Sequence, residues 1–471
     1  MVALEADRPI RHIDEAPMLK GAPFIGSVKE MMTDPARLLY EGFKQHGPVF
    51  RFKLMGRTNY VIAGPEAAKL IDQRGDKNVM RSYEFWHGQV EEFGAKYSLV
   101  SADGEVHDRL RAVLKKGISR DVIVGRYGEA VDVLNVIFDR DWKEGSTIPV
   151  TQRMQRLVSE VIGMIVAGAG PEDAAGDIRT FIKYMLMTKV VKQAPDIILQ
   201  LPFYQNAKKR VFEFAYKLIS DYEKRPPNTD PTRTDFIGEL LRVHREHPDL
   251  IPASDLPQLV LSPYVAGLDT VANTLGSALY ALLKNPDIMA RLKAEVDSVG
   301  VLDETALRNM PVLRGVMLET LRLYPINVSA MRTANRDIEF AGYLIPEGTM
   351  LFCATTVTHF MPEFFPDPYK FDIDRFEPPR REHMKPFAFS AFARGPHTCL
   401  GQGLAEILMM LTLAQIVRRV QVRIDPVDYE MKISAVPTPG PADDFKVYIE
   451  RLLPDPVAGG AAKPAPATAS A

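Results

Sequence analysis

The sharpest chemical signal in the sequence is a cysteine that directly precedes an apolar helical stretch. Cys399 stands in the segment Phe-Ala-Arg-Gly-Pro-His-Thr-Cys-Leu-Gly, residues 392–401. The Gly-Pro pair predicts a turn, and apolar spacing predicts a helix over 400–420. A cysteine at a helix N-terminus is expected to have a lowered pKa, because the macrodipole and the free amides favour the thiolate. Such a thiolate can ligate a metal, whereas a lone cysteine is usually a small buried residue.

A second group of polar residues lies inside the most apolar helical pattern, residues 255–284. Pro263 and Gly267 predict a local break there, which would expose backbone oxygens and leave room for a ligand or water. Asp269 and Thr270 need a reason on this helix, since buried polar groups cost free energy. The simpler interpretation is a kink in which Thr270 bonds back to its own turn.

Two further charged motifs are candidates for buried or binding roles. Glu319 and Arg322 are spaced i and i+3 on an apolar helix, which favours a buried and satisfied pair over a surface bridge. His107 and Arg111 are spaced i and i+4, and on their own they would be an ordinary exposed pair. The other cysteine, Cys353, lies in an apolar strand pattern and is expected to be a buried structural thiol.

The motifs, in this order, resemble those of the cytochrome P-450 superfamily, and the likeness to its soluble bacterial members covers roughly residues 20–450. The resemblance implies a haem-thiolate protein in which Cys399 is the proximal ligand of the iron of haem b (iron protoporphyrin IX). It also places Phe392 and Gly401 beside the cofactor. Ala393 departs from the pattern, since the family mostly has Gly or Ser there, and its methyl is expected to be sterically mild. Leu408 stands where an acidic residue is usual.

The resemblance also assigns roles to the other motifs. Four residues match the oxygen-activating stretch of the long distal helix: Ala266, Gly267, Asp269 and Thr270. In the family the alcohol and the acid hold a water and pass protons to dioxygen. Four residues match propionate-binding positions, where buried anions need cationic donors: His107, Arg111, Arg332 and His397. Three residues are expected to form a structural lock behind the cysteine loop: Glu319, Arg322 and Arg375.

The reaction that the resemblance implies is insertion of one oxygen atom from dioxygen into a mostly apolar small organic substrate, by hydroxylation or oxidative dealkylation. Electrons are expected from a separate ferredoxin with its reductase, or from a flavodoxin, because the chain ends soon after the cysteine helix. The alternatives are a peroxide-using or isomerising haem-thiolate enzyme and a haem-based binding or sensor protein. The acid–alcohol pair argues against the first of these. The alternative without haem is a helical scaffold protein whose cysteine loop arose by chance, and it predicts a colourless protein.

The elements that must position these residues are mainly helical. Apolar spacing predicts helices over 105–118, 126–141, 151–168, 209–224, 255–284, 287–299, 303–307, 312–324 and 400–420. Alternation predicts a hairpin over 48–63, a second β region over 343–353 with its turn at residues 346–349, and short strands near 433 and 447–449. The pattern predicts a mainly α fold with a small β region, and the resemblance implies that this is the P-450 fold. It is a single large domain, residues 21–453, with the long central helix over the haem. Residues 1–20 are expected to be loosely ordered, and residues 454–471 to be a disordered Pro/Ala-rich tail.

Composition excludes several other classes of protein. The chain has 471 residues, 46% hydrophobic and 25% charged, with a formal net charge of -2, so binding of nucleic acid by bulk charge is not expected. Two cysteines exclude a disulfide framework and a four-cysteine zinc site. The sequence has no apolar run of about 20 residues, so no membrane span is expected. A charged N-terminus argues against a signal peptide and predicts a cytoplasmic protein.

Two surfaces follow only by analogy with the family. The substrate pocket is expected to be lined by apolar segments with Phe85, Trp86 and Phe93 among them: 83–93, 185–203, 264–270, 326–330 and 436–438. A basic patch for docking an acidic redox partner is expected from five residues: Arg109, Lys115, Lys116, Arg120 and Arg394.

Overall fold

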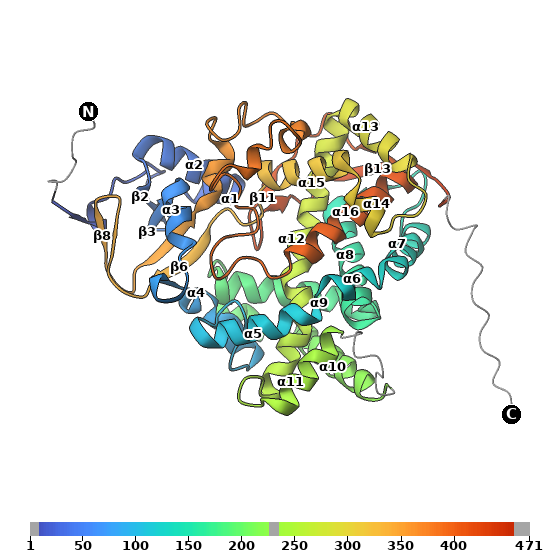
Figure 1. Cartoon of the computed structure of the whole chain (residues 1–471), viewed down its shortest axis with the longest axis horizontal. Coiled ribbons are helices and arrows are strands. Elements are labelled where there is room, and N and C mark those ends of the chain that lie inside the picture. Colours follow the sequence, from blue (N-terminus) through green and yellow to red (C-terminus); the bar gives the residue numbers. More distant parts are fainter. Residues whose placement is uncertain (1–8, 226–234, 456–471) are drawn as a thin grey trace.

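Helices make up most of the chain (Figure 1), which a computed structural model describes over residues 9–225 and 235–455. The helices are α1 (Val28–Thr33), α2 (Pro35–His46), α3 (Gly64–Ile71), α4 (Tyr83–Phe93), α5 (Gly104–Gly117), α6 (Arg120–Val124), α7 (Tyr127–Asp141), α8 (Val150–Ala167), α9 (Ala175–Met185), α10 (Pro202–Glu223), α11 (Phe236–Glu246), α12 (Leu256–Lys284), α13 (Pro286–Asp297), α14 (Glu304–Arg308), α15 (Pro311–Leu323) and α16 (Gln402–Arg419). Every helix expected from apolar spacing is present, with ends shifted by at most two residues, except that α10 begins seven residues before the expected start at 209.

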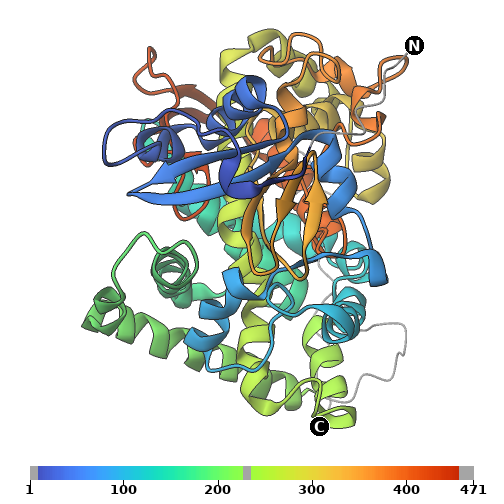
Figure 2. The same ribbon diagram turned by 90° about the vertical axis from the view of Figure 1, so that its left-hand side faces the viewer.

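The strands form small sheets, the largest of which lies at one end of the molecule (Figures 1 and 2). They are β1 (Arg11–His12), β2 (Val49–Leu54), β3 (Arg57–Ala63), β4 (Met80–Arg81), β5 (Thr147–Pro149), β6 (Ala330–Ala334), β7 (Ile338–Phe340), β8 (Tyr343–Ile345), β9 (Met350–Ala354), β10 (Val420–Ile424), β11 (Ile433–Ser434), β12 (Gly440–Pro441) and β13 (Lys446–Leu452). The five-stranded sheet has the order β2-β3-β9-β6-β4, in which β3 and β9 are parallel and the other pairs antiparallel. The predicted hairpin is confirmed as β2–β3.

The long helix α12 runs through the middle of the molecule (Figure 1). Its 29 residues span about 44 Å at 1.5 Å per residue. It packs against α8, α10, α15 and α16, and buried residues occupy most of its faces. A helix that is apolar nearly all round belongs in the interior of a large domain, so α12 is the element around which the helical part is built.

The break expected in α12 is wrong, because the helix is continuous from Leu256 to Lys284 with Pro263 inside it. Proline leaves the carbonyl four residues earlier, that of Leu259, without its backbone donor. The Ser262 hydroxyl donates to this Leu259 oxygen at 2.7 Å and replaces the missing bond. The helix therefore continues through the proline with its carbonyl satisfied.

The ends of the described chain are tied into the fold more firmly than expected. Residues 1–8 lie outside the described residues, but Arg11 and His12 pair with β8 and Ile13 is buried. The expected loose segment over 1–20 therefore differs from the structure in its second half. At the other end, Asp455 accepts hydrogen bonds from Asn135 at 2.6 Å and Gln415 at 2.9 Å. The fold thus extends through Asp455, and the rest of the predicted tail lies outside the described residues.

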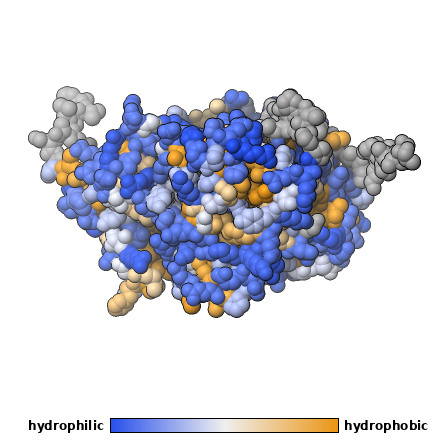
Figure 3. Space-filling model, turned by 90° about the horizontal axis from the view of Figure 1, so that it is seen from below, coloured by the Kyte–Doolittle hydropathy of each residue, from blue (hydrophilic) through white to orange (hydrophobic). Residues whose placement is uncertain are grey.

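The surface is mostly hydrophilic, with small hydrophobic patches on the side that Figure 3 shows. Among the helices that the structure describes, none combines the length and the apolar character needed to cross a bilayer. Cys353 is fully buried in β9, as expected for a structural thiol, and burial raises its pKa to about 12.

Candidate functional site

The cysteine loop is held in shape by its own backbone. The Cys399 amide donates to the Phe392 carbonyl at 2.8 Å, and the Ala393 amide donates to the Ser390 carbonyl at 3.1 Å. The Thr398 hydroxyl donates to the Gly395 carbonyl at 2.7 Å. Two residues of the loop have a left-handed backbone, Gly395 with φ +75° and Ala393 with φ +58°. Glycine is free to adopt this conformation, whereas alanine adopts it under strain, so the expectation that the Ala393 methyl is mild is wrong.

A second set of contacts fastens the loop to the C-terminal end of α3. The Asp72 carboxylate accepts from the Arg394 guanidinium at 2.6 Å and from the Gly395 amide at 3.1 Å. Arg74 donates to the Gly395 carbonyl at 2.8 Å. A Cβ on Gly395 would lie 2.0 Å from the Ile71 carbonyl oxygen, so only glycine allows this approach. The loop is therefore fixed against α3 as well as against its own turn.

The Cys399 thiol itself differs from the sequence-based expectation. Its side chain is accessible to solvent yet recessed among protein atoms, and this burial raises its pKa above the usual value. A hydrogen bond from the Gly401 amide and the positive charge of Arg111 act in the opposite direction. The expected lowering of the pKa at the start of α16 is wrong for the free thiol, because desolvation outweighs the amide and the cation.

Of the residues expected to bind the haem propionates, Arg111 is the one whose charge interacts with Cys399, and His107 lies near Arg111. His107 is 2% exposed, and its Nε2 is buried with no hydrogen-bond partner among the described residues. Burial and the neighbouring His397 lower the pKa of His107. Arg111 is close enough to Cys399 for the two charges to interact, and no described residue hydrogen-bonds to its guanidinium. Arg332 is buried in β6, and its guanidinium donates to the Met331 carbonyl at 2.7 Å.

The fourth expected member of this group, His397, is already partnered. Its Nε2 lies 2.9 Å from an oxygen of Asp103, and its ring centre is 4.3 Å from that of His107. Asp103 also accepts from the amides of Ser82 and Tyr83. Burial favours the neutral acid, but these hydrogen bonds outweigh it and hold the pKa of Asp103 below its usual value. Sequence analysis missed Asp103, which no local pattern marks.

On α12, Asp269 and Thr270 face different surroundings. Asp269 is 9% exposed and accepts a hydrogen bond from the Gln155 amide of α8 at 2.8 Å. Burial raises the pKa of this carboxyl, although the bond from Gln155 opposes the shift. Thr270 is partly exposed, and its hydroxyl donates to the Ala266 carbonyl at 2.7 Å, as the simpler interpretation expected. Ala266 is exposed although it lies in the middle of a buried helix.

The glycine of this stretch, Gly267, lies against α8. A Cβ on Gly267 would lie 2.6 Å from the Cδ1 atom of Ile162. This glycine therefore allows α12 and α8 to pack closely, a use that differs from the expected loosening of the helix. In the cysteine loop, a Cβ on Gly401 would meet no protein atom within 4 Å, so the space beside this residue is open.

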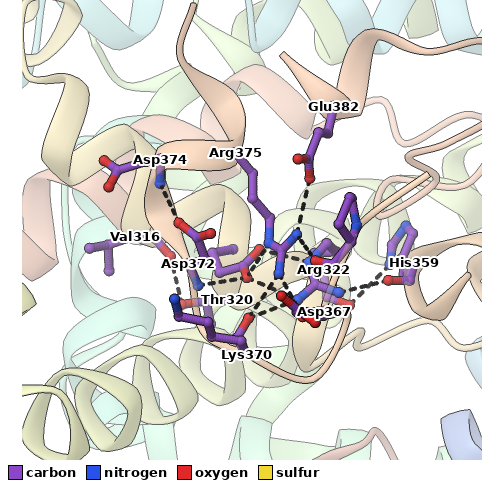
Figure 4. A network of polar contacts seen from close by, with 12 residues as sticks. Val316, Thr320, Arg322, His359, Asp367, Lys370, Asp372, Asp374, Arg375 and Glu382 are labelled. Atoms are coloured by element: carbon purple, nitrogen blue, oxygen red, sulfur yellow. Dashed lines mark hydrogen bonds and ion pairs between the residues drawn. The ribbon is translucent and has the colours of Figure 1, made fainter. Parts of the chain in front are cut away.

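The lock expected from Glu319, Arg322 and Arg375 is present, and all three side chains are fully buried. Figure 4 labels Arg322, Arg375 and Glu382 within this network of polar contacts. Glu319 accepts from Arg322 at 2.7 and 2.9 Å and from Arg375 at 3.2 Å. Glu382 lies 3.1 Å from Arg375 and supplies a second carboxylate. The Arg322 guanidinium also donates to the His359 carbonyl at 2.6 Å. Two buried cations thus meet two buried carboxylates, which is the condition under which such charges are tolerated.

The proposed docking patch is largely neutralised by carboxylates. Three of its members form ion pairs: Arg109 with Asp249 at 3.6 Å, Lys116 with Glu239 at 3.6 Å, and Arg394 with Asp72 at 2.6 Å. Lys115 is exposed and has no ion-pair partner among the described residues. The side chain of Arg120 lies outside the described residues.

The aromatic residues expected at the substrate pocket fall into two classes. Phe93 is 4% exposed and packs against Phe181 and Phe212, with ring centres 5.1 and 5.8 Å away, so it belongs to the core. Phe85 and Trp86 are partly exposed and contact each other edge to face at 5.2 Å. Of these three aromatics, Phe85 and Trp86 are the ones that can offer apolar surface to a ligand.

Comparison with known proteins identifies the family. The family model described as Cytochrome P450 matches residues 17–441. The chain is 26% identical to the cyclooctat-9-en-7-ol 5-monooxygenase of Streptomyces melanosporofaciens, over 86% of this chain and 88% of that protein. It is 28% identical to the abscisic acid 8'-hydroxylase CYP707A1 of Solanum lycopersicum, over 83% and 82%.

Solved structures show the same fold. The cytochrome P450DA heme domain superposes with a TM-score of 0.80 at 20% identity, covering 94% of this chain and all of that one. The retinoic acid-bound cyanobacterial CYP120A1 superposes with a TM-score of 0.78 at 22% identity, with the same coverage. The family match extends over most of the chain and includes the cysteine loop, the lock and α12. The chain belongs to the cytochrome P450 family.

Proposed function

We propose that this P450 monooxygenase binds the iron of its haem b through Cys399 and the haem propionates through His107, Arg111 and Arg332. The observation that carries the assignment is the unpartnered His107 Nε2, buried near the Arg111 guanidinium, which hydrogen-bonds to no described residue. A buried polar atom without a partner is destabilising unless a ligand satisfies it. Two carboxylates of a bound haem have the charge that this group of donors requires.

The remaining features of the loop fit the same cofactor. Cys399 is accessible to solvent, and the space beside Gly401 is free of protein atoms. The Gly401 amide donates to the sulfur and the charge of Arg111 favours its anionic form, so the loop is prepared to hold a thiolate once a metal replaces the proton. We assign His397 to orient the cysteine loop through its hydrogen bond to Asp103.

When bound, a thiolate-ligated haem supplies dioxygen activation and O–O cleavage. The chain contributes proton donors and exclusion of water around that chemistry. We assign Thr270 to hold a water that passes protons on, and Asp269 to supply the protons. The Thr270 hydroxyl is accessible beside the exposed Ala266, and its hydrogen bond to the Ala266 carbonyl keeps the oxygen lone pairs free to accept from water. The raised pKa of Asp269 keeps a proton available nearer to neutrality than an ordinary aspartate would.

The substrate class we propose is a mostly apolar small molecule, oxidised by hydroxylation or oxidative dealkylation. Phe85 and Trp86 of α4 present apolar surface, and segment 326–330 carries no charge. Relatives of this chain are named for cyclooctat-9-en-7-ol and abscisic acid, and one structural neighbour holds retinoic acid. These compounds are largely hydrocarbon with few polar groups, which is the chemistry that such a pocket accepts.

The electron donor we propose is a separate ferredoxin with its reductase. Of the expected docking residues, Lys115 is the exposed cation that the protein leaves without an ion pair among the described residues, so it is the best position for an acidic partner. A flavodoxin would offer a similar acidic surface. We also propose a cytoplasmic location, which the small number of cysteines supports.

The test is oxidation of a substrate from a panel of apolar compounds, with electron donor and dioxygen each omitted in turn. A monooxygenase requires both, a peroxide-using enzyme works with peroxide alone, an isomerising enzyme needs neither, and a sensor binds without product. The matched variants are Thr270→Val and Thr274→Val, since Thr274 is buried and donates to the Thr270 carbonyl at 2.8 Å. We expect Thr270→Val to consume electron donor while forming little product. Thr274→Val should form product for the electron donor consumed in the same ratio as the unmodified enzyme. Equal coupling in both variants would contradict the role of Thr270.

A further inference from the structure

The lock and the cysteine loop are separate parts of the chain, and a histidine outside both motifs connects them. His359 lies in a 3-10 helix, Thr355–Phe360, and is completely buried. Its ring lies nearly parallel to that of Phe389, with centres 5.1 Å apart and an interplanar angle of 16°. Figure 4 shows the contacts between His359 and Arg322 as dashed lines.

Both ring nitrogens of His359 have backbone partners. Nδ1 lies 3.1 Å from the Arg322 carbonyl oxygen, and the Ser390 amide lies 2.9 Å from Nε2. A carbonyl can only accept and an amide N–H can only donate. The partners therefore require the neutral ring with its proton on Nδ1. Burial, with the positive charge of Arg322, lowers the pKa of His359 to about 3, so this form persists across the neutral range.

The contacts on the lock side are reciprocal. The Arg322 guanidinium donates to the His359 carbonyl at 2.6 Å, while the His359 ring donates to the Arg322 carbonyl. Glu319 holds the same guanidinium through two bonds. The position of His359 is thus determined by the lock at both its backbone and its side chain.

The contacts on the loop side lead directly to the turn before the cysteine. Ser390 donates to His359, and its carbonyl accepts from the Ala393 amide at 3.1 Å. The residue before Ala393, Phe392, accepts from the Cys399 amide at 2.8 Å. A parallel contact joins the neighbouring Thr358 hydroxyl to the Ala388 carbonyl at 2.8 Å. Every step from the lock to Cys399 is a backbone hydrogen bond or a single buried ring.

We propose that His359 is a positioning residue for the metal ligand: its neutral ring transmits the fixed position of the lock to Ser390 and so sets where the cysteine loop holds the Cys399 sulfur. The inference rests on the proposed role of Cys399. It predicts that loss of the Ser390 contact loosens the sulfur, while loss of the Arg322 contact alone matters less, because Arg322 and His359 remain joined through the His359 carbonyl.

The experiment compares substitutions that keep one contact each. In His359→Gln the side-chain oxygen reaches the place of Nε2 and can accept from Ser390. In His359→Asn the shorter side chain can donate to the Arg322 carbonyl but does not reach Ser390. His359→Phe keeps the stack on Phe389 and loses both contacts. His383→Phe is the control, since His383 also packs near Phe389, at 6.5 Å, and has no described hydrogen bond.

The readouts on the holoproteins are the carbonyl spectrum of the reduced haem, its rate of conversion to the form without thiolate ligation, and the reduction potential. We expect conversion to be about tenfold faster in His359→Asn and His359→Phe, the factor that loss of one buried hydrogen bond gives. His359→Gln and His383→Phe should convert at about the rate of the unmodified protein. Hydrogen exchange at residues 388–399 should rise in the first pair alone.

The outcomes separate the possible errors. Equal conversion rates and equal potentials in the Asn and Gln variants would overturn the role of His359, whatever their melting temperatures. If His359→Phe does not fold, the Asn and Gln pair decides alone. An unmodified protein without the thiolate-type carbonyl band would instead overturn the assignment of Cys399, a result that is read before any variant is compared.

Discussion

Replacement of Ala393 by glycine should stabilise the cysteine loop, although it removes a methyl group. Ala393 has φ +58°, in the left-handed region. An L-residue there is disfavoured by about 1–2 kcal/mol. Glycine relieves that strain but loses more conformational entropy on folding, about 0.5–1 kcal/mol. At the midpoints of these two ranges, the net stabilisation expected for Ala393→Gly is about 0.75 kcal/mol.

The matched control is Ala391→Gly, two residues earlier in the same loop. Ala391 is also partly buried, but its φ is not positive. Glycine there relieves no strain, so the same chemical change should destabilise by about 0.5–1 kcal/mol. The two substitutions thus delete the same methyl and are expected to have opposite signs.

The assay is the rate at which the carbonyl complex loses its thiolate-type band in moderate urea. With tenfold in rate for each 1.36 kcal/mol, Ala393→Gly should convert about 3.5-fold more slowly than the unmodified protein, and Ala391→Gly should convert faster by a similar factor. Faster conversion in both variants would refute the reasoning, because it would mean that Ala393 carries no backbone strain that glycine can relieve.

Three further predictions concern the lock, α12 and the docking patch. Glu319→Gln leaves two buried guanidiniums with one carboxylate, Glu382, and should lower the free energy of unfolding by about 3–5 kcal/mol and remove most of the holoprotein yield. The control Asp297→Asn, in an exposed pair with Lys293, should lower it by less than about 1 kcal/mol. Equal losses of stability in urea unfolding would contradict the buried network. Because burial raises the pKa of Asp269, the folded protein binds more protons there than the unfolded chain, so the stability contributed by this group is complete below about pH 4 and is lost as the pH rises through the folded pKa. Asp269→Asn should therefore melt above the unmodified protein at pH 7, with a difference that shrinks toward pH 4, and a constant difference would argue against a raised pKa. Lys115→Glu should slow haem reduction by the partner at low salt without changing substrate binding, whereas Lys116→Glu, whose lysine already pairs with Glu239, should have the smaller effect.

Sequence analysis predicted the elements that are marked by patterns of residues close together in the chain. Helices such as α8 and α12 carry long apolar patterns, and the Gly-Pro turn before Cys399 marks the loop. Buried Glu319 and Arg322 were predicted because their helix is apolar on several faces. These inferences need only residues that lie close together along the chain.

The residues that were missed act through partners far away in sequence. Asp72 holds Arg394 across 322 positions, and Asp103 holds His397 across 294. Nothing near Asp72 or Asp103 in the chain indicates these partners. His359 likewise gains its importance from Ser390 and Arg322, which reach it only in the folded protein.

The errors of prediction also have local physical causes. The break expected at Pro263 does not occur, because the Ser262 hydroxyl serves the carbonyl that proline leaves free. Burial of the thiol raises the pKa of Cys399, whereas the prediction of a lowered pKa considered only the helix N-terminus. In both cases the sequence pattern does not show the deciding interaction, which is a side-chain hydrogen bond at Pro263 and burial at Cys399.

The most direct test of the central claim is the absorption spectrum of the reduced carbonyl complex, recorded for the unmodified protein and for Cys399→Ser. We predict a far red-shifted main band in the unmodified protein, which marks haem bound through a thiolate, and the loss of that band in Cys399→Ser. Cys353→Ser, which removes the buried thiol of β9, should leave the band in place. A band of the imidazole-ligated type in the unmodified protein, or a thiolate-type band that survives in Cys399→Ser, would contradict the account.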